Sequence, residues 1–242
     1  MKLFVHGIPD TPIVWSPLVE ALGLSETAMC PALPGLATPA PMDFAGTPDA
    51  YVDWLIAEME AAFERDGPID LVGHDWGGLF VVRAACLRPD LIRSWTAANA
   101  VPDPNDPWPL IAHLWATPLL GEFLMAISPP SDLEKALVRQ RMSEGLAAHE
   151  AVHWKRESRR AILKLYRSGM KVGASWDSDI DKVHPRGLVI WGGSDPYTSD
   201  ETAETFCKRT GATLELLGNC GHWSIVECTD DVTGALKAHW SG

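Results

Sequence analysis

The sequence lacks the features that would place it in a membrane or on a nucleic acid. No apolar run approaches the roughly 20 residues of a membrane-spanning helix. The first apolar stretch, residues 3–5, is too short for a signal peptide and ends in the turn residues His6-Gly7. Lys and Arg number 20 against 32 Asp and Glu, so the net charge is −12. Nucleic acids and anionic membranes present phosphate groups, which proteins bind with clustered basic side chains. Because acidic residues predominate in this chain, we expect no membrane and no nucleic acid as partner.

Cysteine is scarce as well. The five cysteines form no Cys-x-x-Cys pair, and their odd number argues against a disulfide framework. We expect reduced thiols, a cytoplasmic location, and neither a metal nor another cofactor. What the chain does have is 242 residues with 46% hydrophobic content, which is enough for one sizeable α/β domain with a true core.

Short apolar runs alternate with segments of helical periodicity along most of the chain, a pattern typical of a mostly parallel, doubly wound α/β sheet. The predicted strands are 3–5, 27–30, 69–72, 92–98, 187–191 and 213–217. After the fourth strand, a proline-dense stretch at 101–109 opens a segment that is helical in pattern. We predict a core domain of residues 1–101 and 182–242, with an inserted helical cap of residues 102–181.

The strand at 69–72 runs into Gly73-His74-Asp75-Trp76-Gly77, and apolar residues at helical spacing follow. Glycines two positions before and after a residue on a strand-to-helix turn form the frame in which that residue is exposed as a nucleophile. Serine, the usual occupant, attacks acyl carbon. The carboxylate of Asp75 gives a useful intermediate mainly at an sp3 carbon that bears a leaving group, as an alkyl ester that water must then hydrolyse. The simpler alternative is an aspartate that only caps the following helix.

Two further polar residues occupy the same kind of position. Asp195 and His222, like Asp75, each lie just past the carboxyl end of a predicted strand, where open parallel sheets place their sites. Their order along the chain is nucleophile, acid and base. Each position alone is also compatible with a helix cap or a loop histidine, but their coincidence favours a catalytic site.

With these motifs the chain resembles the α/β-hydrolase superfamily, in the aspartate-nucleophile branch of epoxide hydrolases and haloalkane dehalogenases. The matching segments, spread over nearly the whole chain, are His6-Gly7-Ile8-Pro9, Gly73-His74-Asp75-Trp76-Gly77-Gly78, Gly193-Ser194-Asp195 and Gly221-His222-Trp223. The resemblance implies that Asp75 attacks the substrate, that His222 activates the hydrolytic water and that Asp195 orients the imidazole. It also implies an oxyanion hole formed by the backbone N–H groups of Trp76 and Ile8.

The chain departs from the family at its amino terminus. Family members usually have two strands before the His-Gly motif, whereas only a few residues precede it here. We therefore expect a sheet of about six strands whose edge must be covered. A homodimer is one way to cover that edge.

An epoxide leaving group requires a proton donor. The resemblance implies that cap tyrosines, usually two, supply it, and the segment 165–168 resembles the one that bears one of them, which makes Tyr166 a candidate. The predicted cap contains no second tyrosine. His113 and His153 are the candidates for the second donor.

A halide leaving group is instead held by weak N–H donors. The resemblance implies Trp76 together with an asparagine or a second tryptophan, but Ile8 occupies the place where many haloalkane dehalogenases carry that asparagine. The second indole would then come from a cap tryptophan: Trp115 or Trp154, with Trp108 and Trp176 as further candidates. No arginine stands beside Asp75 to hold a carboxylate, so we expect an uncharged substrate.

These observations favour an epoxide hydrolase that converts a small, uncharged organic epoxide and water into a vicinal diol. The alternative is a haloalkane dehalogenase. An alternative of another class is a non-catalytic protein that uses its tryptophan-rich cavity to bind an apolar ligand.

Overall fold

The computed structural model describes residues 1–105 and 108–242; residues 106 and 107, part of the proline-dense stretch, lie outside the described residues. The chain forms one sheet in the order β2-β1-β3-β4-β5-β6, and each neighbouring pair is parallel. The strands are β1 (Lys2–Val5), β2 (Ala28–Met29), β3 (Ile69–His74), β4 (Ile92–Ala98), β5 (Gly187–Gly192) and β6 (Thr213–Leu217). The predicted parallel sheet of about six strands is confirmed.

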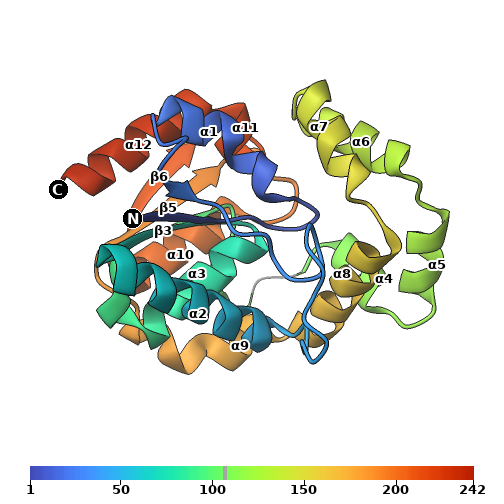
Figure 1. The fold of residues 1–242 in the computed structure, drawn as a ribbon, viewed down its shortest axis with the longest axis horizontal. Helices are drawn as coiled ribbons and strands as arrows, with labels where there is room; N and C mark the ends of the chain where they lie inside the picture. The colour runs from blue at the N-terminus through green and yellow to red at the C-terminus, as the bar shows by residue number, and fades with distance from the viewer. Residues whose placement is uncertain (106–107) are drawn as a thin grey trace.

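Helices cover both faces of the sheet, because parallel strands are joined by crossover connections and bury both faces. One core contains α2 (Pro48–Asp66), α3 (Trp76–Leu87) and α10 (Asp200–Thr210). The second core contains α1 (Ser16–Ala21), α11 (Ser224–Glu227) and α12 (Thr229–Ser241). Figure 1 shows α1, α11 and α12 above the sheet and α2 and α3 below it. Along β1, Leu3 and Val5 belong to the first core and Phe4 to the second, as strand alternation requires.

Local signals set the ends of α2, the longest helix of the core. Thr47 caps its first turn by accepting a hydrogen bond from the N–H of Ala50 at 3.3 Å, and Pro48 follows at the first helical position. Gly67 ends the helix with a φ of 74°, a conformation that favours glycine. The chain can therefore turn directly into β3, the strand that carries the site.

Among its described residues, the segment between β4 and β5 contains helices and no strand. Its α-helices are α4 (Leu110–Ala116), α5 (Leu120–Ile127), α6 (Pro130–Arg139), α7 (Glu144–Val152), α8 (Arg156–Gly169) and α9 (Val172–Trp176). Figure 1 shows α4 to α8 grouped beside the core. The 3-10 turn Asp177–Lys182 that follows α9 is tied to the core, because Arg83 of α3 donates to Asp179 at 2.7 Å. The division into core and cap at residues 102 and 181 stays a prediction.

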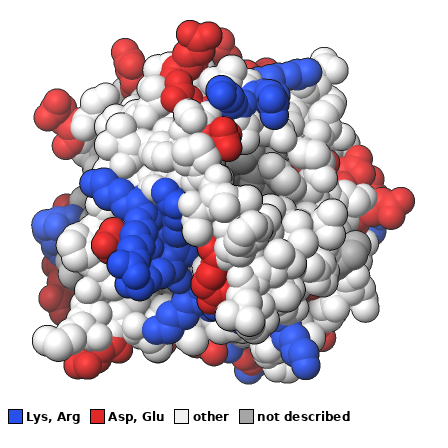
Figure 2. Space-filling view, turned by 90° about the vertical axis from the view of Figure 1, so that its right-hand side faces the viewer, with Lys and Arg blue, Asp and Glu red and all other residues white. Residues whose placement is uncertain are grey.

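The outer face of this helical group carries little charge over much of its area. Figure 2 shows this face: the largest group of Lys and Arg side chains lies at its left, smaller groups lie near its top and bottom, and much of the area between them is uncharged. Large apolar side chains are exposed on and around α4 and α5: Leu110, Leu119, Phe123 and Ile127. Over the described ranges no single helix is long and apolar enough to cross a membrane. Taken together α4 and α5 pass that test of length and composition, but they are bent by 108° at their junction.

The expectation of reduced, unpaired thiols is wrong for two cysteines. Cys220 and Cys228 form a disulfide across eight residues, with their Cα atoms 6.3 Å apart. An odd total does not exclude such a bridge, because a short local loop needs only two cysteines at a suitable distance. Cys30, Cys86 and Cys207 are free. The disulfide closes the loop that contains His222.

Candidate active site

Asp75 lies on the sharp turn between β3 and α3, with φ of 52° and ψ of −128°. Residues other than glycine seldom adopt positive φ, and such strain costs about 1–3 kcal/mol. Two glycines permit the turn: a Cβ on Gly73 would lie 2.3 Å from the carbonyl oxygen of Gly77, and a Cβ on Gly77 would lie 2.1 Å from that of Val5. The Asp75 side chain does not cap α3. The simple capping alternative therefore does not apply.

The carboxylate of Asp75 meets a backbone donor from the loop after β1. The N–H of Ile8 donates to Asp75 Oδ1 at 2.8 Å. This close approach depends on Gly7, where a Cβ would lie only 2.5 Å from the Cβ of Asp75. Trp76, whose N–H is the second predicted donor, is the first residue of α3 at the same turn. A donor in this place stabilises negative charge that develops on the oxygen it contacts.

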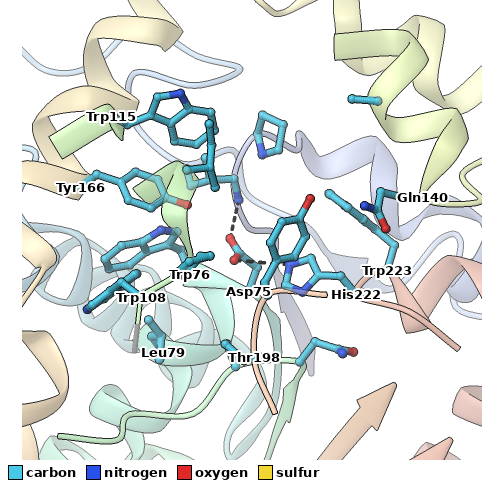
Figure 3. A pocket seen from close by; sticks show the side chains of 18 of the residues that line it. Asp75, Trp76, Leu79, Trp108, Trp115, Gln140, Tyr166, Thr198, His222 and Trp223 are labelled. Carbon is cyan, nitrogen blue, oxygen red and sulfur yellow. Dashed lines mark hydrogen bonds and ion pairs between the residues drawn. The ribbon is translucent and has the colours of Figure 1, made fainter. Parts of the chain in front are cut away.

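His222 lies between the two aspartates that the sequence singles out; Figure 3 shows its contact with Asp75. Its Nε2 is 3.5 Å from Asp75 Oδ2, and its Nδ1 is 2.7 Å from Asp195 Oδ2. The buried carboxylate of Asp195 also accepts from Asn99 Nδ2 and from the N–H of Tyr197, both at 2.8 Å. The structure thus brings Asp75, Asp195 and His222 together, at the carboxyl ends of β3, β5 and β6.

The two carboxylates determine the charge of His222. Burial lowers the pKa of an imidazole, but hydrogen bonds and charges from Asp195 and Asp75 outweigh it here and raise the pKa of His222 to about 10. Burial likewise opposes ionisation of Asp195, yet the hydrogen bond from His222 keeps its pKa below the usual value. His222 is therefore protonated at neutral pH in the resting site. Loss of the negative charge on Asp75 would lower the pKa of His222 and leave Nε2 able to accept a proton.

A pocket with a volume of about 330 Å³ opens over Asp75 and His222. Among the residues singled out from the sequence, it is lined by Ile8, Trp76, Trp108, Trp115, Trp154 and Tyr166. The two histidines considered as second proton donors, His113 and His153, are not among its lining residues. Within the described ranges no cluster of three His, Cys, Asp or Glu side chains is arranged to hold a metal ion.

Tyr166 of α8 is fixed by edge-to-face contacts with tryptophans. Its ring centroid lies 5.4 Å from that of Trp76 and 5.2 Å from that of Trp115. Figure 3 shows its hydroxyl directed toward Asp75. Burial, and after it the charge of Asp75, raises the pKa of the Tyr166 phenol. The phenol is therefore protonated at neutral pH and can donate to an oxygen bound over Asp75.

Comparison with known proteins assigns the family. Residues 3–235 match the model of the alpha/beta hydrolase family. The chain belongs to this family. Its fold superposes on an epoxide hydrolase from Vigna radiata with a TM-score of 0.79 and 20% identity, covering 99% of this chain and 90% of that one. It superposes equally well on a meta-cleavage product hydrolase from Pseudomonas fluorescens, with a TM-score of 0.81, 18% identity and the same coverage.

Curated relatives of this α/β hydrolase match over shorter parts of their own length. An epoxide hydrolase from Caballeronia sordidicola is 34% identical over 95 residues, 38% of this chain and 28% of that protein. The dihydrolipoyllysine-residue acetyltransferase component of the acetoin cleaving system of Cupriavidus necator is 23% identical over 242 residues, 99% of this chain and 63% of that protein. The chain thus spans less than two thirds of these relatives, and the similarities leave its reaction open.

The α/β-hydrolase site contains polar residues that the sequence patterns missed. Asn99 directly follows β4, and its Oδ1 accepts from Ser224 Oγ at 2.6 Å while its Nδ2 binds Asp195. Tyr197 lies two residues after Asp195 and lines the pocket, as does Gln140 at the end of α6. A polar residue at the carboxyl end of a strand was the available signal for Asn99. Sequence spacing contains no comparable signal for Gln140, because it reaches the site only through the packing of α6.

Proposed function

We propose that this α/β hydrolase is an epoxide hydrolase that acts through an alkyl ester on Asp75. The observation that carries the proposal is the Tyr166 hydroxyl, directed toward a carboxylate that occupies the nucleophile position (Figure 3). A carboxylate attacks sp3 carbon usefully when the leaving group is assisted, and a protonated phenol is the assistance that a strained ether oxygen needs. The mostly apolar pocket lining suits a small, uncharged substrate.

The first half of the proposed reaction opens the ring. Asp75 Oδ2, the oxygen not bound by Ile8, attacks a ring carbon, and the bond from that carbon to the epoxide oxygen breaks. The released oxygen takes the proton of Tyr166. The Tyr166 phenolate then recovers a proton from the His222 imidazolium through water. This step leaves a neutral imidazole beside a neutral ester, in keeping with the lower pKa of His222 once the Asp75 charge is gone.

The second half hydrolyses the ester. His222 Nε2 takes a proton from water, and the resulting hydroxide adds to the carboxyl carbon of Asp75. The N–H of Ile8, with that of Trp76, stabilises the oxyanion at Oδ1. Collapse breaks the bond between the carboxyl carbon and Oδ2, and Oδ2 leaves with the substrate carbon as the second hydroxyl of the diol, taking the remaining proton of the water. The products are the diol, the Asp75 carboxylate and the His222 imidazolium, which restores the resting charges.

The indole N–H groups of the cap weigh against a halide site. Trp108 Nε1 donates to the carbonyl of Met170 at 2.9 Å, and Trp154 Nε1 donates to that of Ser128 at 3.0 Å. Two of the indoles that would bind a departing halide are thus already engaged. Haloalkane dehalogenation stays the alternative, and it would depend mainly on Trp76 and Trp115.

Trapping the ester distinguishes these reactions. In a His222→Gln variant the first half proceeds and the second lacks its base, so the ester persists. We expect the intact protein to gain the mass of a whole epoxide when it is treated with uncharged epoxides, with the modification mapped to Asp75. The double variant Asp75→Ala/His222→Gln is the control and should gain nothing.

Other outcomes of this trapping experiment have distinct meanings. A mass gain equal to an alkyl group without its halogen, with haloalkanes and not with epoxides, would establish the dehalogenase. No adduct with either class of compound would contradict a catalytic role and favour the apolar-ligand-binding protein.

Tyr166→Phe should slow epoxide opening by about 10²–10⁴-fold, because the leaving oxygen loses its proton donor. Release of halide from any haloalkane that the protein accepts should change little, since a halide needs no proton. The measurement is the rate of ester formation in the His222→Gln background, followed by mass spectrometry. Equal slowing with both classes of compound would contradict the role given to Tyr166.

A further inference from the structure

Only three tyrosines occur in the sequence, and two of them reach the pocket. The third, Tyr51, is buried in the core of the sheet, where its hydroxyl donates to the carbonyl of Pro34 at 2.8 Å. Tyr197 belongs to the loop between β5 and α10 rather than to the predicted cap. Its own N–H donates to Asp195, so its backbone is fixed to the same carboxylate that orients His222.

The Tyr197 ring lies beside the base. Its centroid is 4.9 Å from that of His222, with the two rings nearly perpendicular, and 6.3 Å from that of Trp223. Tyr166, by contrast, packs on Trp76 and Trp115. The two tyrosines therefore line the pocket in different places, Tyr197 beside His222 and Tyr166 on α8 beside Trp76.

Gln140 lines the same pocket as Tyr197. Its side chain acts on the Tyr197 phenol and lowers the pKa against the effect of burial. Figure 3 shows Gln140 on the His222 side of Asp75 and Tyr166 on the other side. An amide oxygen can accept the phenol proton and an amide N–H can donate to the phenol oxygen, so Gln140 can hold the hydroxyl in one direction.

The negative charge of Asp75 raises the pKa of both phenols. Burial raises the pKa of Tyr197 first, and the negative charges of Asp195 and Asp75 raise it further. Burial and then the charge of Asp75 act on Tyr166 in the same way. Each hydroxyl therefore keeps its proton at neutral pH, which is the state in which it donates.

We propose that Tyr197 is the second phenol donor of the site: with Gln140 as its positioning residue, it donates a hydrogen bond to the substrate oxygen from the side opposite Tyr166. This inference rests on the proposed epoxide hydrolase function and deepens it. In the opening step the carbon–oxygen bond breaks and Tyr166 transfers its proton to the oxygen. Tyr197 keeps its own proton and stabilises the charge on that oxygen through its hydrogen bond. The second donor then comes from the core, so the helical segment between β4 and β5 has to supply only one phenol, that of Tyr166.

The test compares the three tyrosines as matched Tyr→Phe variants in the His222→Gln background. The probe is styrene oxide, and the readout is the rate of ester formation on Asp75. We expect Tyr197→Phe to slow the reaction on the order of 10²-fold, the loss typical of one preorganised donor. Tyr51→Phe should stay within about two-fold of the parent, since that side chain does not line the pocket.

A double-mutant cycle tests the positioning role of Gln140. Gln140→Leu should slow ester formation when Tyr197 is present and have no further effect in the Tyr197→Phe protein. A merely structural effect of the leucine would appear in both backgrounds. Thermal melting of each variant confirms that the compared proteins are folded.

The outcomes separate this inference from the proposed function. If the parent forms the ester and Tyr197→Phe forms it at the same rate, the second-donor role is wrong and the epoxide hydrolase proposal stands. If the parent forms no ester with styrene oxide or with other uncharged epoxides, the proposed function fails, and the role of Tyr197 fails with it.

Discussion

Replacing Asp75 by asparagine should abolish turnover, with a loss of about 10⁴-fold or more, because no other described carboxylate contacts both Ile8 and His222. The amide keeps the size of the side chain and removes its charge and nucleophilicity. The fold should persist, since the turn depends on its glycines and not on a cap made by Asp75.

The same variant has an electrostatic consequence at His222. The pKa of His222 is raised to about 10 against the effect of burial by Asp195 and Asp75 together. With one of these charges removed, the pKa should fall by about one unit or more, each unit corresponding to 1.36 kcal/mol of interaction. NMR titration of the imidazole measures this shift. The Asp75→Asn variant thus reproduces, without substrate, the fall in the pKa of His222 that ester formation is proposed to cause.

Asp132 provides the matched control for Asp75. It lines the same pocket but is exposed on α6. Asp132→Asn should therefore leave both turnover and the pKa of His222 nearly unchanged. A comparable loss in both variants would indicate a general effect of pocket charge, and it would contradict the nucleophilic role of Asp75.

Glu150→Gln should make the protein more stable at neutral and alkaline pH. Glu150, on α7, is fully buried, and neither of its carboxylate oxygens has a hydrogen-bond partner among the described residues. Burial, and after it the charge of Asp10, raises the pKa of Glu150 from 4.5 to about 9. The folded state thus holds a proton that the unfolded chain releases, so the native protein loses stability as pH rises from about 4.5 to about 9.

Glutamine removes this ionisation while keeping a similar shape. The gain in unfolding free energy should be absent near pH 4.5 and reach about 1–3 kcal/mol near pH 7. For a chain of this length each kcal/mol corresponds to about 2–4 °C in Tm. Thermal unfolding followed between pH 4.5 and 9 measures the difference. Glu144→Gln, an exposed change on the same helix, is the control and should have no pH-dependent effect.

A gain that is the same at every pH would contradict this assignment, because it would come from packing and not from the proton. A loss at every pH would indicate that the protonated carboxyl group of Glu150 makes favourable contacts that an amide does not replace. Asp10 accepts a bifurcated hydrogen bond from Trp223 Nε1, with 3.0 Å to Oδ1 and 3.2 Å to Oδ2, and its Oδ2 lies 3.4 Å from His74 Nδ1. Its partners are therefore retained when Glu150 is changed.

Much of the fold was readable from local patterns. Strands at 92–98 and 213–217 have the predicted bounds, since an apolar run between breakers is a property of a few neighbouring residues. The sharp turn at Asp75 was equally local, because the spacing of Gly73 and Gly77 marks the positions that have no room for a Cβ. The predicted strand at 27–30 is reduced to Ala28–Met29 at the edge of the sheet, where only one neighbouring strand supports it.

The wrong or incomplete predictions concern contacts that the spacing of residues along the chain does not specify. The Cys220–Cys228 disulfide depends on the path of the loop and not on the number of cysteines. His113 and His153 were plausible second donors by residue type, but they do not line the pocket. Tyr197 was not predicted as a proton donor, because it follows β5 and lies outside the predicted cap.

The sequence by itself determined the order and the place of the three candidate catalytic residues. Asp75, Asp195 and His222 each follow a strand, and parallel strands bring their carboxyl ends to one edge of the sheet. Only the tertiary structure decided which side chains surround Asp75. The directions of Tyr166, Tyr197 and Gln140 depend on how helices from separate parts of the chain pack over the sheet. Side-chain packing is set by three-dimensional contacts, which a spacing along the chain does not contain.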